Sequence, residues 1–141
     1  MKKTKGFTLI ELMVVIVILG ILAAVIAPRI PGFVNKAKEG KTKGNLGNLR
    51  SAMNIYYSDK DGVYPTTTDL AGALTPKYIK EIPEAEMPPN HAASNAVVTI
   101  SPLGDAGGYA YEEDSTEDGW GDIVINCNAH TDSSSTAWSS Y

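Results

Sequence analysis

The first part of the chain has hydrophobic side chains in a pattern that leaves no polar face. Between Leu12 and Ala27 every residue is apolar, and Gly20 alone lacks a side chain. Counted from Phe7, the apolar segment has about 21 residues and would span roughly 30 Å as a helix, the thickness of a bilayer's hydrocarbon core. A surface helix of a soluble domain would show polar residues at a period of 3.6. The pattern therefore predicts a transmembrane helix over residues 7–28.

A second hydrophobic pattern begins after a short proline-rich segment. Apolar residues recur three or four positions apart and form a single stripe: Leu46, Leu49, Ala52, Met53, Tyr56 and Tyr57. This spacing predicts an amphipathic helix over residues 29–58 whose stripe packs against the rest of the chain. Pro28 and Pro31 lie between the two patterns, and a proline inside a helix removes a hydrogen bond. We therefore expect a helix kink at these two prolines.

Residues 59–141 show the short, turn-rich segments of a small β-containing head. Three segments are rich in β-branched or aromatic residues and are predicted strands: 96–101, 108–113 and 122–126. The turn residues between them favour a three-stranded antiparallel sheet packed on the helix stripe, after a connecting loop. Pro83, Pro88 and Pro89 predict an irregular loop, and residues 128–141 form a polar tail with Trp138 and Tyr141 as anchors. The fold class is α+β, a long N-terminal hydrophobic helix packed against a small antiparallel sheet.

One acidic residue stands at the start of the apolar helix. A carboxylate such as that of Glu11 costs about 3 kcal/mol in lipid, so it normally has a partner or a task. Lys2, Lys3 and Lys5 precede it and hold that end in the cytoplasm. A secretory signal peptide fits less well, because Pro28 would directly follow the cut. A plain membrane anchor explains the apolar run but not the residues around Glu11.

Those residues carry a family resemblance. The string Lys5-Gly6-Phe7-Thr8-Leu9-Ile10-Glu11-Leu12 resembles the leader-peptidase site of type IV pilins and type II secretion pseudopilins. The resemblance implies cleavage between Gly6 and Phe7 by a prepilin peptidase, N-methylation of Phe7, and removal of residues 1–6 as a leader. It also implies a pilin-like fold, with residues 7–28 as the membrane and filament-core half of the helix and 29–58 as its amphipathic half.

Cleavage would create an ammonium group on Phe7. Glu11 of one subunit can then pair with the Phe7 ammonium of a neighbour, which neutralises a carboxylate that is costly in a low dielectric. This pairing would set the axial register between subunits, so Phe7 and Glu11 are the predicted filament-assembly residues.

Length and charge agree with this interpretation. The chain has 141 residues, of which 43% are hydrophobic and 20% charged, as expected for one folded domain beside an anchor. From residue 29 to 60 there are seven basic and two acidic residues, whereas residues 81–141 contain eleven acidic residues and no Lys or Arg. A basic stem and an acidic head can pack against each other between subunits or remain two solvated faces. The acidic head makes nucleic acid an unlikely partner.

Residues with catalytic or metal-binding chemistry are few. Cys127 is the single cysteine, so no intrachain disulfide can form, and we expect it to be a small buried apolar residue. His91 and His130 are isolated in sequence and are expected to be solvated. Three acidic residues have partly EF-hand-like spacing and form a weak calcium candidate: Asp114, Asp118 and Asp122. An acidic solvated turn is the favoured interpretation there, so no cofactor is expected beyond a possible calcium ion.

No catalytic motif is recognisable, and the sequence predicts a structural protein, not an enzyme. The expected function is that of a pilin, a subunit of a type IV pilus-like filament, with a type II secretion pseudopilin as the alternative. A monomeric membrane-anchored binding module is an alternative of another class. The expected partners are copies of the chain, the prepilin peptidase, inner-membrane assembly machinery and, before assembly, membrane lipid. The precursor is expected as a single-pass inner-membrane protein and the product in a cell-surface pilus or a periplasmic pseudopilus.

Overall fold

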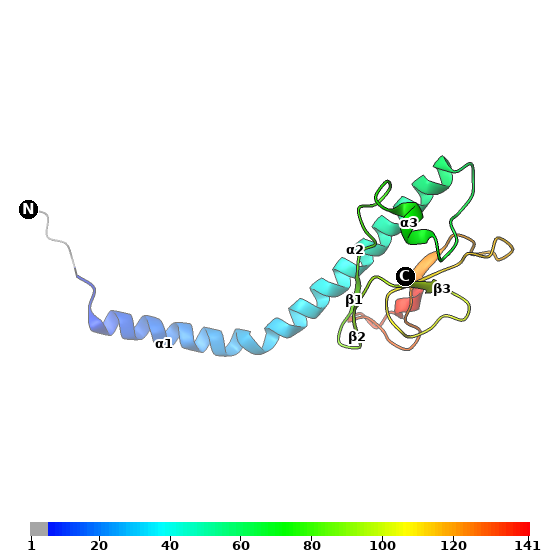
Figure 1. The fold of residues 1–141 in the computed structure, drawn as a ribbon. Helices are drawn as coiled ribbons and strands as arrows, with labels where there is room; N and C mark the ends of the chain where they lie inside the picture. The colour runs from blue at the N-terminus through cyan, green and yellow to red at the C-terminus, as the bar shows by residue number, and fades with distance from the viewer. Residues whose placement is uncertain (1–5) are drawn as a thin grey trace, which may run out of the picture. The chain divides into compact units, whose positions relative to one another are not determined.

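The computed structural model describes residues 6–141, so the predicted leader lies almost entirely outside the described residues. The chain forms two compact units, residues 1–34 and 35–141. The first unit contains helix α1 (Leu9–Ile26), a 3₁₀ turn η1 (Ala27–Arg29) and the start of helix α2 (Ile30–Asp59). The remaining elements belong to the second unit (Figure 1): α3 (Leu70–Leu74), β1 (Ala85–Met87), β2 (His91–Ser94), β3 (Val97–Thr99), β4 (Tyr109–Tyr111), β5 (Ile123–Ile125) and η2 (Trp138–Ser140).

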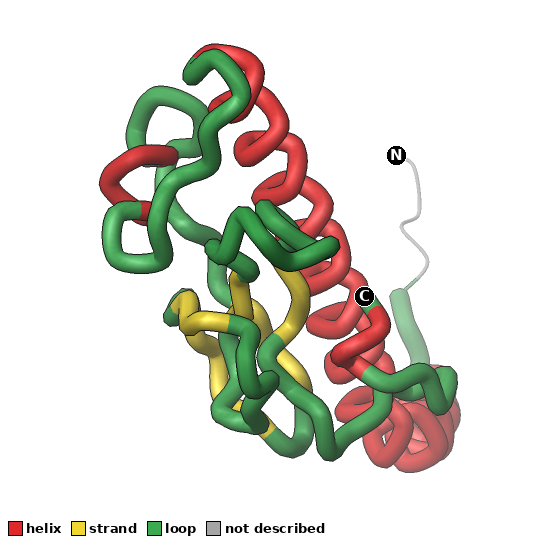
Figure 2. Tube along the Cα trace, turned by 90° about the vertical axis from the view of Figure 1, so that its right-hand side faces the viewer, coloured by secondary structure: helices red, strands yellow, loops and turns green. Residues whose placement is uncertain are grey.

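The second unit is built on one side of α2. Strands and loops of the head lie along that side (Figure 2), and the predicted stripe supplies buried residues there: Leu46, Leu49, Ala52 and Met53. Tyr56 is partly buried against the same cluster. The apolar partners from the head include Leu70, Leu74, Tyr109, Tyr111, Ile123, Ile125 and Trp138, all fully buried. The prediction that the stripe forms the base of the head is confirmed.

The three predicted strands are present, but their sheet is mixed. β4 pairs antiparallel with β5, whereas β3 pairs parallel with β4, with Val97 opposite Tyr109 and Thr99 opposite Tyr111. The expected all-antiparallel sheet is therefore wrong. The connection between β3 and β4 does not make a hairpin, because it runs back beside the segment that follows β5. Gly104 N donates to Asn126 Oδ1 (3.0 Å) and Asn128 N donates to Gly104 O (3.1 Å), which hold the loop in that path.

The end of this loop requires glycine. Gly108 has a φ of +76°, and a Cβ there would lie 2.5 Å from the carbonyl oxygen of Ala96. A side chain would therefore collide with backbone that cannot move aside cheaply. The glycine lets the chain turn into β4 beside the start of β3.

Residues 83–95 contain a feature that the sequence did not reveal. β1 and β2 form a two-stranded antiparallel pair where an irregular loop was expected. Their sequences, Ala-Glu-Met and His-Ala-Ala-Ser, lack the β-branched residues that usually indicate strands. Tertiary contact stabilises them instead: Thr42 Oγ1 of α2 lies 2.7 Å from both Glu86 O and Glu86 N, and can donate to the former while it accepts from the latter.

Leu49→Ala tests the packing of the stripe. Leu49 is fully buried, so its truncation should lower the free energy of unfolding by about 2–5 kcal/mol through lost burial and a cavity. Ile55→Ala on the same helix is the control, since Ile55 is 56% exposed and its truncation should cost less than about 1 kcal/mol. Chemical denaturation of the full chain in detergent measures both. Equal losses would contradict the assignment of the buried face.

Candidate functional site

Helix α1 begins with a reciprocal cap made by Thr8 and Glu11. Glu11 Oε2 accepts hydrogen bonds from Thr8 N (2.8 Å) and Thr8 Oγ1 (2.7 Å). Glu11 N in turn donates to Thr8 Oγ1 (3.3 Å), which completes a capping box. Thr8 has extended backbone angles, φ −83° and ψ 151°, as an N-cap residue requires. The helix start is therefore encoded by the residues that follow the predicted cleavage bond.

The predicted cleavage residues lie in accessible backbone before this cap. Gly6 and Phe7 precede the helix and are both exposed. An uncovered peptide bond outside regular secondary structure suits a protease substrate. Cleavage between Gly6 and Phe7, methylation of Phe7, and the assembly role of Phe7 and Glu11 remain predictions at this point.

The residues of α1 are exposed on every side. All 18 residues from Leu9 to Ile26 are exposed, and Glu11 is the single charged residue among them. Among the described residues, one helix is long and apolar enough to cross a membrane, and its apolar window lies near the N-terminus. Such a surface is unfavourable in water, because each large aliphatic side chain gains about 1.5–3 kcal/mol on burial. α1 therefore needs an apolar environment from lipid or from other chains.

Pro28 and Pro31 mark a local change in helix type. Pro28 lies inside the 3₁₀ turn η1, and Pro31 is the second residue of α2; neither proline has a backbone N–H to donate. The prolines thus divide α1 from α2 without ending the helical path. The bend itself remains a prediction.

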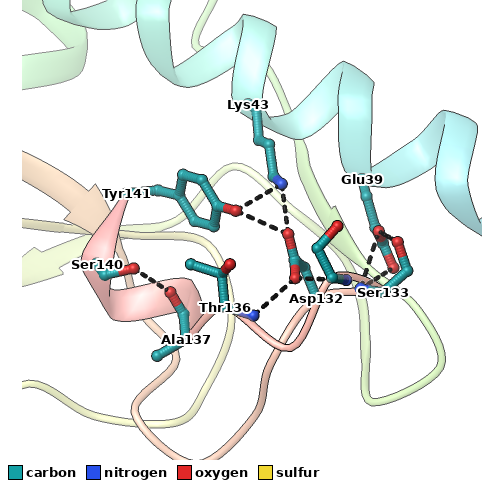
Figure 3. Close-up of polar contacts among 9 residues, drawn as sticks. Glu39, Lys43, Asp132, Ser133, Thr136, Ala137, Ser140 and Tyr141 are labelled. Atoms are coloured by element: carbon teal, nitrogen blue, oxygen red, sulfur yellow. Dashed lines mark hydrogen bonds and ion pairs between the residues drawn. The ribbon is translucent and has the colours of Figure 1, made fainter.

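Two acidic residues of the second unit are buried where the C-terminal segment meets α2 (Figure 3). Asp132 Oδ2 lies 2.5 Å from Lys43 Nζ and accepts a hydrogen bond from Tyr141 OH (2.7 Å). Asp132 Oδ1 accepts from two backbone N–H groups, those of Ser134 (2.8 Å) and Thr136 (2.9 Å). These contacts tie the tail to the helix, as the anchoring role predicted for Tyr141 requires.

A second contact one turn away reinforces the first. Glu39 on α2 accepts hydrogen bonds from Ser133 Oγ (2.6 Å) and from Ser133 N (3.2 Å). The fully buried Trp138 and the partly buried Tyr141 cover the same stretch of α2, and Lys43 Nζ lies 4.1 Å from the centre of the Tyr141 ring. The tail is thus fixed by paired charges around an aromatic contact.

The electrostatic consequence is a pair of opposite pKa shifts. The hydrogen bond from Lys43, helped by those from Thr136 and Tyr141, lowers the pKa of Asp132 well below its usual range. Burial disfavours the charged form of Lys43, but the contacts with Asp132 and Tyr141 outweigh burial and raise the pKa of Lys43. Both groups are therefore charged at neutral pH.

The basic stem uses other charges within the chain as well. Lys38 Nζ and Lys41 Nζ lie 3.1 Å and 2.7 Å from the two carboxylate oxygens of Glu86 in β1. The sequence suggested that stem and head charges would either pair between subunits or remain solvated. The structure shows pairing between stem and head inside one chain.

The weak calcium candidate is not assembled into a cluster. Asp114, Asp118 and Asp122 are all exposed, and Asp114 Oδ1 accepts hydrogen bonds from Thr116 N (2.9 Å) and Thr116 Oγ1 (2.7 Å). Those hydrogen bonds lower the pKa of Asp114. Within residues 6–141, the potential metal ligands that the structure brings together are different ones. Calcium binding at the three aspartates remains a prediction.

The residues brought together are His91, Asp105, Cys127 and His130. One ligand atom from each lies within 4.8 Å of the others. Sequence reasoning missed this group, because it treated the histidines as isolated and solvated. Cys127 is fully buried, as expected, but beside polar groups. The pKa of Asp105 is lowered, mainly by hydrogen bonding with the Cys127 thiol and then by contacts with His130 and His91. The pKa of Cys127 is raised by burial and by the nearby Asp105 carboxylate.

Known proteins resemble this chain in ways that agree with the N-terminal geometry. Residues 1–27 match the family model described as the prokaryotic N-terminal methylation motif. The type II secretion system core protein G of Aeromonas hydrophila is 37% identical over 97 residues, which cover 59% of this chain and 67% of that protein. The chain belongs to the pilin and pseudopilin family. Members of this family are structural proteins.

Other relatives from the pilin and pseudopilin family are similar to the chain to the same extent. The core protein G of Vibrio cholerae serotype O1 is 39% identical over 97 residues, covering 60% of this chain and 66% of the relative. The fimbrial protein EcpC of Eikenella corrodens is 38% identical over 100 residues, which cover 69% of this chain and 61% of that protein. The chain spans about half to two thirds of the length of the curated relatives it matches. No solved structure is significantly similar to the chain.

Asp132→Asn tests the contact between tail and stem. Because the folded-state pKa of Asp132 is lowered, its contribution to stability is fully present above the unfolded pKa of about 3.9 and is lost as pH falls toward the folded value. The variant should be less stable at pH 7, and the acid dependence of its stability should weaken by up to about one proton. Urea midpoints between pH 2.5 and 7 measure this. Asp118→Asn, which alters an exposed carboxylate, is the control, and equal acid slopes in the two variants would refute the assignment.

Proposed function

We propose that this chain is a structural subunit of a helical filament that assembles through α1. It is made as a single-pass inner-membrane precursor, cut between Gly6 and Phe7 by a prepilin peptidase, and methylated on Phe7. The observation that supports this most is the uncovered apolar helix, which carries one carboxylate at its start and follows a matching methylation motif. The chain acts by assembly and not by catalysis.

The apolar surface of α1 requires two successive environments. Before assembly, bilayer lipid covers it, and the lysines that precede Gly6 keep that end cytoplasmic. After assembly, α1 helices of neighbouring subunits replace the lipid. The second unit has its own core on α2 and does not supply the cover that α1 needs. A monomeric anchored module would leave α1 in lipid permanently and would not pellet as long polymers.

Glu11 supplies the register between subunits. Within residues 6–141 both capping hydrogen bonds use Oε2, so Oε1 can accept another donor without loss of the cap. The ammonium that cleavage creates on Phe7 of a neighbouring subunit is a suitable donor. In a low dielectric the ion pair has a much lower free energy than the two separate charges. Subunits that are misaligned, and so leave the charges unpaired, are therefore disfavoured.

Two filament types fit this assembly. The relatives named as type II secretion core protein G favour a periplasmic pseudopilus, and the fimbrial protein EcpC favours a cell-surface pilus. Both use the same processed helix, so the choice between them does not alter the role of Phe7 or Glu11. The corresponding inner-membrane assembly machinery is the expected partner in either case.

Glu11→Ala separates processing from assembly. The variant should be cleaved normally, because the residues at the bond are unchanged, but filaments should fall at least about ten-fold, since each subunit lacks its register contact. Mass spectrometry of the product and electron microscopy of the sheared fraction measure the two steps. Gly6→Val is the comparison and should leave uncut precursor in the membrane. Normal filaments from Glu11→Ala would refute the register mechanism.

Deletion of the gene distinguishes the two filament types. Loss of filaments from the sheared surface fraction, with secretion intact, identifies a pilus subunit. Loss of an exported protein from the medium, with surface filaments intact, identifies a pseudopilin. Neither loss, together with a monomeric chain in detergent-free sedimentation, would contradict the proposed filament and support the binding module.

A further inference from the structure

Four potential metal ligands from separate segments converge in the second unit. His91 begins β2, Asp105 lies in the connection between β3 and β4, and Cys127 and His130 follow β5. We propose that His91 Nε2, Asp105 Oδ1, Cys127 Sγ and His130 Nδ1 form a structural zinc site. This inference is independent of the filament proposal, because none of the four residues lies in the N-terminal helices.

The distances fit a tetrahedral ion. Asp105 Oδ1 lies 3.2 Å from His91 Nε2 and 3.2 Å from His130 Nδ1, and Cys127 Sγ lies 3.5 Å from His130 Nδ1. Zinc bonds of about 2.0–2.3 Å place neighbouring ligand atoms roughly 3.3–3.7 Å apart at the corners of a tetrahedron. These three separations are close to those edges, and all four ligand atoms lie within 4.8 Å of one another, so side-chain movements of about 1 Å suffice to hold an ion.

The direction of the contacts distinguishes this group from a cysteine nucleophile with its base. A catalytic histidine uses one ring nitrogen toward the nucleophile and the other toward the orienting carboxylate. Here His130 Nδ1 faces both Cys127 Sγ and Asp105 Oδ1. Asp105 likewise presents one oxygen, Oδ1, to both imidazoles. One atom from each residue faces a common centre, as ligands of a metal do.

The backbone around the group is held in place. The buried Asn126 accepts from Gly104 N (3.0 Å) through its side chain and donates to Gly107 O (3.2 Å). Asn128 Nδ2 donates to Leu103 O (2.9 Å). These hydrogen bonds fasten the loop that carries Asp105 to the segment that carries Cys127 and His130. Gly107, with a φ of +80°, lets the same loop approach His91, since a Cβ there would lie 3.3 Å from His91 Cβ.

Burial provides both a closed side and an entry path. Cys127 is fully buried, whereas the side chains of Asp105 and His130 are 34% and 33% exposed. An ion can therefore enter past Asp105 and His130 and bind the thiolate at the inner side. The thiol proton is released to solvent when the thiolate binds the ion.

The donor set selects the metal. One sulfur and two imidazole nitrogens suit zinc, whereas calcium and magnesium prefer oxygen ligands. The site therefore differs in chemistry from the calcium candidate at Asp114, Asp118 and Asp122. With four protein ligands it resembles structural zinc sites, in which no position is left for substrate.

Such an ion would act as a cross-link in a head that cannot form an internal disulfide. It would connect the β1–β2 pair, the β3–β4 connection and the segment after β5, which no disulfide links to one another.

Zinc binding to the full-length chain tests the proposal. The protein is purified in detergent without a histidine tag, stripped with a chelator, and titrated with zinc against a chromophoric competitor. We expect one zinc per chain. Asp105→Asn and His130→Gln should each weaken binding at least about ten-fold, while Asp114→Asn, the matched carboxylate control, should leave it within about two-fold. Wild-type binding no tighter than that of Asp105→Asn, an equal loss in Asp114→Asn, or tighter binding of calcium than of zinc would each overturn the proposal.

Cobalt substitution tests the thiolate directly. Cobalt bound at this site should give the visible bands of a tetrahedral ion together with a near-ultraviolet thiolate band, and Cys127→Ser should remove the thiolate band. If Cys127→Ser does not fold, the same band should shift in His130→Gln, whose side chain is partly exposed and lies 3.5 Å from the Cys127 sulfur through Nδ1. A cobalt spectrum without a thiolate band in the wild type would overturn the assignment of Cys127 as a ligand.

Discussion

An apolar helix without a polar face has to be covered by something, and this requirement governs the N-terminal unit. No residue of α1 is buried within the chain, although nearly all of its side chains are aliphatic. The single carboxylate, Glu11, stands at the one place where the backbone also has unsatisfied N–H groups, and the cap uses it. The unit therefore combines a surface that needs other chains or lipid with one carboxylate, which caps the start of the helix.

The apolar core of the second unit is buried by contacts within that unit. The stripe on α2 is buried under the head, and the basic residues beside the stripe pair with acidic residues of the head at Glu86 and Asp132. Three basic residues of a charge asymmetry that looks like an intersubunit signal in the sequence thus pair inside one chain: Lys38, Lys41 and Lys43. This leaves α1 as the part of the described structure whose burial depends on partners.

Much of this arrangement follows from sequence patterns, because local periodicity determines it. The apolar run, the stripe from Leu46 to Tyr57 and the three strand cores were all recognisable from spacing and residue type. The parallel pairing of β3 with β4 was not, because it depends on the path of a loop held by Asn126 and Asn128, which are distant in sequence from Gly104. β1 and β2 were missed because Thr42 and a tertiary contact stabilise them in place of β-forming residues.

The ligand group of the head was hidden for a similar reason. His91, Asp105 and His130 have no motif spacing. They come close to Cys127 only because hydrogen bonds hold the β3–β4 connection against the segment after β5. The residues predicted for assembly, Phe7 and Glu11, in contrast lie within one short string, so the sequence alone was enough to suggest them.

The cap at Thr8 has a further consequence for the processed chain. The aligned peptide dipoles of α1 place partial positive charge at the helix start, and a free amine on Phe7 would add a full positive charge one residue before the cap. Glu11 offsets part of this charge, but its Oε2 is already shared with the helix's own first turn. The N-terminal end of a cleaved subunit would thus carry excess positive charge. This charge is unfavourable in the membrane interior and is stabilised when an acidic group comes close to it.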